Sequence, residues 1–318
     1  ANRIISINKE LILNDALSDV KLIVNGDVND ERIFIQTINL YHNIFKTDEI
    51  EGTSGDWDLS FSNLELQGGV GAENGGVFFI EGNDVSLSLD NVFVKETEVL
   101  YNGGAVYAVG TDAVSIFLHD SVLKDNKATL GSAIYSYSED GLSKVEVENS
   151  SIINNQAITT IANSVGAGIY SEGLNSEVNV VNSTIVGNSA DKAGAIYSHS
   201  TNLNAGSSVV NVISSTIAGN TDNTMSGGIY VSASSSESNA TVSLVNSIVY
   251  GNYTGNRASD IAFSEDSIHT LNVAYSIYGT ANADPSQDSI DISQFSTTKM
   301  NIHNIFANDS VIDEMERW

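Results

Sequence analysis

Acidic and amide side chains recur at one fixed place in a repeating sequence pattern. Asp84, Asp112 and Asp140 each lie six residues after an apolar residue of the repeat, and Asn175 and Asn202 take the same place further along. If the repeats stack as strands, oxygens in adjacent repeats would lie about 4.8 Å apart. Such a column could bind calcium or supply the carboxylates of a glycoside hydrolase. We favour a third interpretation, in which the three aspartates point into water from loop tips.

A second candidate group combines one histidine with carboxylates. Alignment of neighbouring repeats through their inward apolar residues places Asp90, His119 and Glu148 on one outer strand face, with Glu146 beside them. An imidazole between carboxylates favours its charged form. The group could act as a general acid, as a set of metal ligands or as a surface ion pair, and with a single histidine we favour the ion pair.

Aromatic residues form a third column. Six copies of the repeat carry one directly after the apolar anchor: Phe79, Tyr107, Tyr135, Tyr170, Tyr197 and Tyr230. If the anchor faces a core, the rings lie outside it as a strip. The five tyrosines could bind sugar rings or another protein, or they could pack beneath adjoining loops. Packing is the interpretation we favour.

An internal repeat predicts the elements that position these side chains. A block of small residues and an apolar pair occurs seven times, from GGVFF at 75–79 to a degenerate ASDIA at 258–262. Between the blocks, short segments alternate apolar and polar residues with a period of two, as at Val85, Leu87 and Leu89. This period indicates strands, and the Gly and Asn residues at corners indicate turns. The chain is therefore predicted to be a parallel β-solenoid, with its length variations in loops.

A second block, such as IVGN at 185–188, alternates with the first and ends in asparagine in most copies. Its apolar position should stack inside the solenoid. The asparagine positions predict a side-chain ladder that bonds along the stack and needs no ligand. Its members are Asn126, Asn155, Asn188, Asn220 and Asn252, with Thr97 and Thr280 at the two ends.

The two alternating blocks resemble the repeats of bacterial polymorphic outer-membrane proteins, in which a GGA-I/L/V block alternates with an F-x-x-N block. They are also similar to secreted bacterial right-handed β-helix proteins, most clearly in VNSTIVGNSA at 181–190 followed by AGAIY at 193–197. The resemblance covers roughly residues 60–280, and Phe79, Thr97 and Asp260 depart from the pattern near its ends. It implies a right-handed fold and a surface-exposed or secreted protein, often an adhesin or autotransporter passenger, without a common catalytic set.

Composition narrows the functional classes. The 318 residues include 40 acidic and 13 basic side chains, for a net charge of −27, and no cysteine. The charge disfavours nucleic acid and anionic membranes, and the few basic residues do not form the cationic groove of a polysaccharide lyase. Without cysteine, stability must come from packing and hydrogen bonds. No apolar run approaches the roughly 20 residues of a membrane span.

We therefore expect an all-β chain with two parts. Residues 1–19 form an amino-terminal capping segment, helical over Asn8–Asp19, and residues 20–318 form a single-stranded right-handed parallel β-helix of about nine to eleven coils. The clear repeats span about 60–280. The chain should be a monomer or part of a larger chain.

Three functions stay open at this stage. The first, which we predict, is a non-enzymatic protein of the bacterial surface or the extracellular space, an adhesin-like passenger that binds a polysaccharide or a protein surface. The second is a polysaccharide-degrading hydrolase or lyase with carboxylates on adjacent coils. The third is a structural spacer of a larger surface protein. No cofactor is required, and calcium at Asp84, Asp112 and Asp140 is the one candidate ion.

Overall fold

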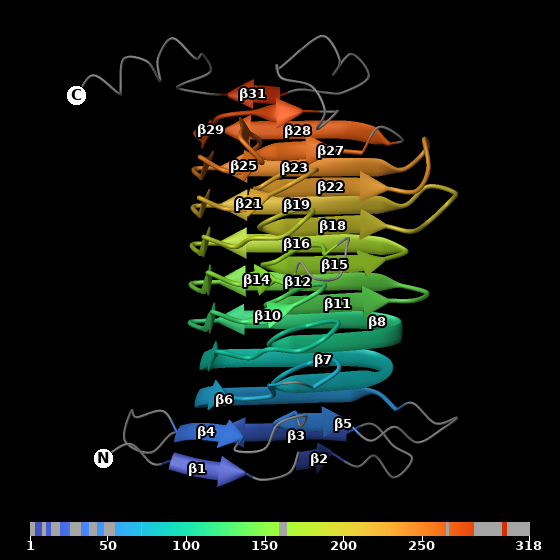
Figure 1. The fold of residues 1–318 in the computed structure, drawn as a ribbon. Helices are drawn as coiled ribbons and strands as arrows, with labels where there is room; N and C mark the ends of the chain where they lie inside the picture. Colours follow the sequence, from blue (N-terminus) through green and yellow to red (C-terminus); the bar gives the residue numbers. More distant parts are fainter. Residues whose placement is uncertain are drawn as a thin grey trace, which may run out of the picture.

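The computed structural model describes residues 43–47, 55–70, 72–158, 164–264 and 267–280 with their side chains. Six further strands are described by their bounds and pairing: Ile4–Ile7 (β1), Leu11–Leu13 (β2), Val20–Asn25 (β3), Ile33–Thr37 (β4), Ala281–Asn282 (β30) and Asn301–His303 (β31). The described parts contain strands and no helix, stacked as a parallel β-solenoid (Figure 1). The predicted all-β solenoid is confirmed.

Each turn of the solenoid presents three faces in a fixed order, and each strand pairs in parallel with its counterpart in the next turn. The first face contains the apolar anchors. Its strands are Phe45–Thr47 (β5), the first parts of Phe78–Lys95 (β7) and Val106–His119 (β8), Ile134–Ser138 (β11), Ile169–Gly173 (β15), Ile196–Ser200 (β18), Ile229–Ala233 (β22) and Ile261–Phe263 (β27).

The second face follows a turn, and the third follows a tight corner. The second holds β3, the first part of Trp57–Gln67 (β6), the middle of β7, the end of β8, Leu142–Glu148 (β12), Asn175–Val181 (β16), Ser207–Ile213 (β19), Asn239–Val245 (β23) and Ile268–Ala274 (β28). The third holds β1, β4, the ends of β6 and β7, Val122–Lys124 (β9), Ser151–Ile153 (β13), Thr184–Val186 (β17), Thr216–Ala218 (β20), Ile248–Tyr250 (β24) and Ile277–Tyr278 (β29).

Short strands in the loops that return to the first face add a few further pairings. They are Lys127–Ala128 (β10), Gln156–Ala157 (β14), Thr221–Asp222 (β21), Tyr253–Thr254 (β25) and Arg257–Ala258 (β26). The β25–β26 pair is antiparallel, and β10–β14 and β21–β25 are parallel.

The predicted anchors lie opposite one another along the first face. The register joins Phe45 to Phe78 and continues through the following anchors to Ile261, which makes eight turns. Strands β2 and β30 extend this ladder by one strand at each end. The expected nine to eleven coils are reached only when these end strands are included. The right-handed winding implied by the resemblance stays a prediction.

A single apolar core runs through the stack. On most strands buried and exposed side chains alternate, because successive side chains of a strand point to opposite sides. The inward residues of all three faces are nearly or fully buried, and they stack on the same residue type from turn to turn, as at Ile185 and Ile217. Repetition of the same apolar positions from turn to turn therefore builds the core.

The helical cap expected over Asn8–Asp19 is wrong at Leu11–Leu13. These residues form β2, which pairs with β5 and places Leu11 opposite Phe45. Leu11 and Leu13 are two positions apart, which is the strand period, and the exposed edge of β5 supplies backbone partners that a helix would not use. Residues 8–10 and 14–19 lie outside the described part of the chain.

Candidate functional site

The five predicted asparagines lie in one continuous ladder at the turn after the third face. All are fully buried, and each Nδ2 from Asn126 to Asn220 donates to the Oδ1 of the next asparagine at 2.9 Å. The same Oδ1 accepts from the backbone N–H of the preceding asparagine at 2.9 to 3.1 Å. Because these polar atoms are bonded within the protein, the ladder holds the turns together and presents no group to a ligand.

Asp260 ends this ladder, although its block is a degenerate copy of the repeat. Its Oδ1 accepts from the backbone N and the Nδ2 of Asn252 at 2.9 and 2.8 Å. Its Oδ2 accepts from the backbone N of Thr280 at 3.0 Å. Burial raises the pKa of Asp260, and the hydrogen bonds from Asn252 and Thr280 oppose that rise. The departure from the pattern therefore has a structural purpose: a carboxylate with two oxygens joins Asn252 to Thr280.

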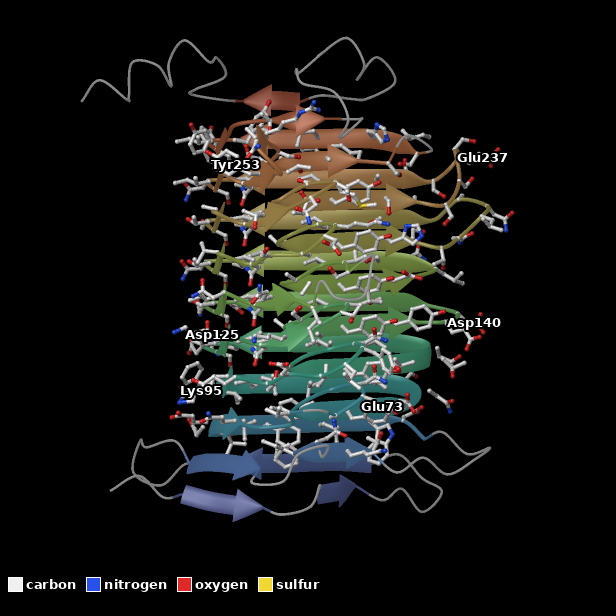
Figure 2. All side chains as sticks on the ribbon, in the orientation of Figure 1. Glu73, Lys95, Asp125, Asp140, Glu237 and Tyr253 are labelled. Atoms are coloured by element: carbon white, nitrogen blue, oxygen red, sulfur yellow. The ribbon has the colours of Figure 1, made fainter. Side chains whose placement is uncertain are left out.

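The aspartates of the first predicted column lie exposed at the turns between the first and second faces. Asp84 pairs with Ala113 and not with Asp112, because the register shifts between Gly82 and Asp84. Figure 2 places Asp140 at the edge of the stack. Burial, and then the charges of Asp56 and Asp112, raise the pKa of Asp84. All three carboxylates are exposed, but Asp84 and Asp112 lie within β7 and β8 where these strands bend, and of the three only Asp140 lies in a loop.

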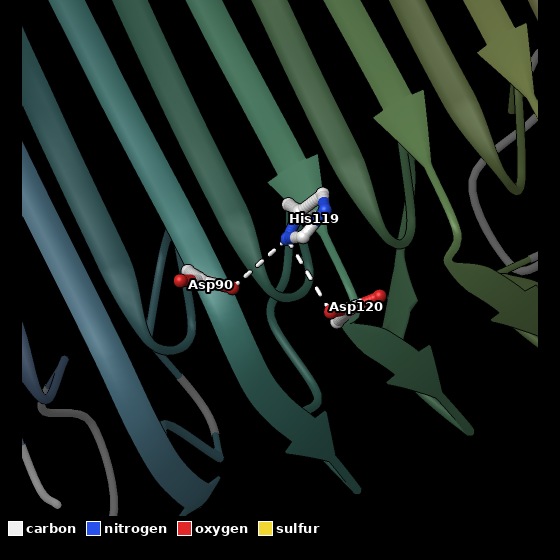
Figure 3. A group of neighbouring side chains, drawn as sticks. All are labelled: Asp90, His119 and Asp120. Carbon is white, nitrogen blue, oxygen red and sulfur yellow. Dashed lines mark hydrogen bonds and ion pairs between the residues drawn. The ribbon is translucent and has the colours of Figure 1, made fainter.

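The second predicted group is brought together on the second face. Asp90, His119 and Glu148 occupy matching positions of three successive turns. His119 Nδ1 lies 3.0 Å from Asp90 Oδ1 and 3.5 Å from Asp120 Oδ2 (Figure 3). Asn149 Nδ2 lies 3.3 Å from His119 Nε2, so in the neutral ring Nε2 accepts from the amide and the proton on Nδ1 points to Asp90. The hydrogen bond to Asp90 is the largest cause of a raised His119 pKa.

The second carboxylate close to His119 is that of Asp120, which the strand alignment missed. Asp120 has a left-handed backbone (φ 48°) at the corner after β8, and it therefore turns back toward the histidine. Among the described residues, Asp90, His119 and Asp120 form the one group of three potential metal ligands whose atoms all lie within 4.8 Å of one another. Their side chains are 57%, 46% and 54% exposed, which is the environment of a surface ion pair.

The aromatic column is a stack of rings on the first face. Neighbouring ring centroids from Phe79 to Tyr230 are 4.9 to 5.8 Å apart, and the planes differ by 8° to 24°. The ring faces are thus covered by neighbouring rings, and a sugar would meet only edges and hydroxyls. Tyr107 and Tyr170 donate their hydroxyls to Glu81 and Glu172. Burial raises the pKa of Tyr135, Tyr170 and Tyr197. The geometry favours packing.

A further row on the first face was not singled out from the sequence. Two residues after the tyrosines, Glu172, His199 and Ser232 occupy matching positions of three successive turns. His199 Nδ1 lies 2.6 Å from Ser232 Oγ, and its Nε2 lies 3.2 Å from the Oγ of exposed Ser234. Burial lowers the pKa of His199, and the charge of Glu172 opposes this. Counting three residues from each anchor would have found the row.

The sequence analysis also missed an uncharged zone on the outer surface of the later turns. Residues 178–188, 207–221, 239–253 and 267–282 contain no Asp, Glu, Lys or Arg, in a chain with a net charge of −27. On the third face of the later turns and at the corners on either side of it, large apolar side chains are 40% to 65% exposed. They are Ile213, Val245, Ile248, Tyr250, Tyr253 and Tyr275. We call these six residues the apolar corner.

Some members of the apolar corner are direct neighbours. Ile213 pairs with Val245 in the register, and Ile248 and Tyr250 lie two positions apart on β24. Tyr275 is the most exposed member, at 65%, and has a left-handed backbone (φ 53°). Other turns place mainly asparagine at that position, including Asn149 and Asn246. A bulky residue there is unfavourable for the backbone.

Comparison of the chain with protein-family models, with curated proteins and with solved structures finds no match. Among the described residues, no helix has the length and apolarity that a bilayer crossing requires.

Proposed function

We propose that this chain is an extracellular or surface-displayed binding protein, an adhesin-like solenoid that holds a polysaccharide against its apolar corner. The observation that carries the proposal is the apolar corner itself: six large side chains exposed on successive turns, all from sequence segments that contain no charged residue. Monomeric proteins seldom expose apolar side chains together in this way unless the patch binds something.

The chemistry of the zone fits an uncharged polysaccharide. Tyr250, Tyr253 and Tyr275 expose aromatic rings that can cover the C–H face of a sugar, and their hydroxyls can bond at the rim. The neighbouring outward side chains are amides and hydroxyls, such as Asn211 and Thr216, which match sugar hydroxyls. A polymer rich in carboxylates or sulfates would be repelled by a chain of net charge −27.

The test is binding of the whole chain to a panel of immobilised polysaccharides, both neutral and acidic. We expect retention on at least one neutral polymer and a loss of about tenfold or more in a Tyr250→Ser, Tyr275→Asn double variant, since burial of exposed aromatic area carries the affinity. The matched control is Lys95→Ser, Lys124→Ser, which changes the same strand position as Tyr250 in earlier turns. Equal loss in both variants, or retention only on acidic polymers, would contradict the proposal.

A further inference from the structure

We propose that Ser234 and His199 form a nucleophile and general base that hydrolyse small uncharged acyl esters. This activity goes beyond the proposed binding function and lies on the first face, where it does not share residues with the apolar corner. Ser234 directly follows β22, on the loop that also carries Glu237 at the edge of the stack (Figure 2).

The hydrogen bonds give each group a role. Ser234 Oγ lies 3.2 Å from His199 Nε2, within reach of proton transfer, and Ser234 is exposed to a substrate. On the other side of the ring, Ser232 Oγ lies 2.6 Å from Nδ1. Ser232 is 4% exposed and also hydrogen bonds to Tyr197, so it is held in place. With the proton on Nδ1 donated to Ser232, Nε2 is left to accept the proton of Ser234.

The surroundings keep the imidazole ready to accept a proton. His199 is partly buried beside the ring of Tyr197, with a centroid distance of 6.0 Å. This burial lowers the pKa of His199, so the ring is neutral near pH 7. Glu172, on the turn below, opposes that shift and stabilises the charged ring once it has taken a proton. Tyr170 donates its hydroxyl to Glu172 and thereby orients the carboxylate.

The loop after Ser234 supplies donors for a developing oxyanion. Among the described residues, the backbone N–H groups of Ser235 and Ser236 have no acceptor. The turn that presents them is held by two hydrogen bonds, from Glu237 N to Ser235 Oγ at 3.2 Å and from Ser238 N to Ser235 O at 2.9 Å. The N–H of the residue after a nucleophile is a recurrent oxyanion donor in serine hydrolases.

The reaction balances with water as the only co-reactant. Ser234 Oγ bonds to the ester carbonyl carbon while its proton moves to His199 Nε2. The C–O bond to the alcohol then breaks, and the alcohol leaves with that proton. Water next attacks the acyl-serine, His199 takes one proton from it, and Ser234 recovers this proton as the carboxylic acid departs. The carboxylates at Glu172 and Glu237 and the net charge favour uncharged esters over anionic ones.

The experiment measures p-nitrophenyl acetate hydrolysis by the whole chain and labelling by a fluorophosphonate probe, with the labelled peptide identified by mass spectrometry. We expect the probe on Ser234, with loss of fluoride, and a fall of about 10²-fold or more in the catalysed rate in Ser234→Ala and in His199→Gln. Ser214→Ala is the control for an exposed serine elsewhere on the surface, and His119→Gln is the control for an exposed imidazole.

Both controls should keep the wild-type rate and the label. Ser234 is exposed, so its alanine variant is expected to keep the wild-type melting temperature, and any loss of rate then belongs to the hydroxyl. Two outcomes would overturn the proposal: an unchanged rate in Ser234→Ala, or a label that stays on Ser234 when His199 is replaced. Because Ser234→Ala leaves the apolar corner intact, polysaccharide binding by this variant separates the failure of this proposal from that of the binding function.

Discussion

The earlier and later turns of the solenoid share one interior but have opposite outer surfaces at the same corner. In the earlier turns, the corner carries Asp90, His119 and Asp120, with Lys95 and Lys124 on the third face. In the later turns, the matching positions are occupied by the apolar corner. Figure 2 shows the two regions along one edge of the stack, with Lys95 and Asp125 below and Tyr253 above. Beneath both, the asparagine ladder continues without a break.

This difference shows that the same fold can carry different residues on its outer surface. Inward residues and ladder asparagines supply the packing and the backbone hydrogen bonds of each turn, so outward residues can change from ions to tyrosines without altering the register. The acidic side chains that give the chain its charge are absent from the later strands of the second and third faces. A local absence of charge in such an acidic chain is therefore more informative about binding than the charge itself.

The largest predicted effect tests whether the interior is the same in both regions. Replacing Asn155 by Ala in the earlier turns, or Asn220 by Ala in the later ones, removes one ladder amide and leaves the buried N–H groups of Asn126 or Asn188 without acceptors. Each change should cost about 3 kcal/mol of unfolding free energy, since an unsatisfied buried group costs roughly 1 to 3 kcal/mol and a cavity adds to it. Urea denaturation measures both.

The control is Asn211→Ala, which removes a half-buried outward amide that donates to Asn179 at 2.8 Å. It should cost about 1 kcal/mol or less, because water can replace the lost partner. If the losses of unfolding free energy in the two ladder variants differed by more than about 2 kcal/mol, the two regions would not share an equivalent interior. The difference between them would then include the core as well as the outer surface.

The features that the sequence predicted are those that depend on a fixed spacing. The anchors, strands and ladder asparagines recur at each turn, so alignment of the copies places them in register. Alignment of the repeats places Asp84 opposite Asp112, but the register shifts after Gly82 and Asp84 pairs with Ala113. The alignment also misses Asp120 as a neighbour of His119, because a left-handed corner turns its side chain toward the histidine. Neither a bulge nor a corner angle follows from a period of two.

The row that contains His199 could have been found from the spacing but was not. It lies at a fixed distance from the anchors, yet its residue type changes at every turn, so no column of like residues indicates it. The contact between His199 and Ser234 depends on a loop path after β22, and the repeat does not encode that path. Variable positions of a repeat protein therefore require the structure before their chemistry can be recognised.

The second predicted effect concerns the corner position occupied by Tyr275. Tyr275→Asn should raise the unfolding free energy by about 1 kcal/mol, because asparagine tolerates a left-handed backbone and tyrosine does not. The reciprocal change in the earlier turns, Asn149→Tyr, should destabilise by at least as much, since it also removes hydrogen bonds to His119 and from Asn182. Thermal melts of the two variants test whether Tyr275→Asn stabilises the chain and Asn149→Tyr destabilises it. A stabilising Asn149→Tyr would show that the corner does not select asparagine.

A smaller effect compares a histidine from each region through its dependence on pH. Hydrogen bonding to Asp90 raises the pKa of His119, so its stabilising contribution is present below pH 6.5 and is lost as the pH rises through the folded-state pKa. Burial of His269 beside Phe263 lowers its pKa, so its contribution is present above pH 6.5 and is lost as the pH falls. Urea midpoints of His119→Gln and His269→Gln from pH 5 to 8.5 should diverge from wild type in opposite directions. A shared direction would contradict these assignments.

The smallest expected effect is that of calcium. Asp84, Asp112 and Asp140 are exposed at separate turns, so we expect the melting temperature in millimolar calcium to equal that in excess EDTA when the ionic strength is matched. A site bound only in the folded state would add about 2.7 kcal/mol at calcium concentrations 100 times its Kd, which a thermal melt would detect. A rise with calcium that magnesium does not reproduce, and that Asp112→Asn abolishes, would restore the metal column. A rise that persists in Asp112→Asn but disappears in Asp90→Asn would instead place the ion at His119. Charged positions of the earlier turns would then bind a ligand just as uncharged ones are proposed to do in the later turns.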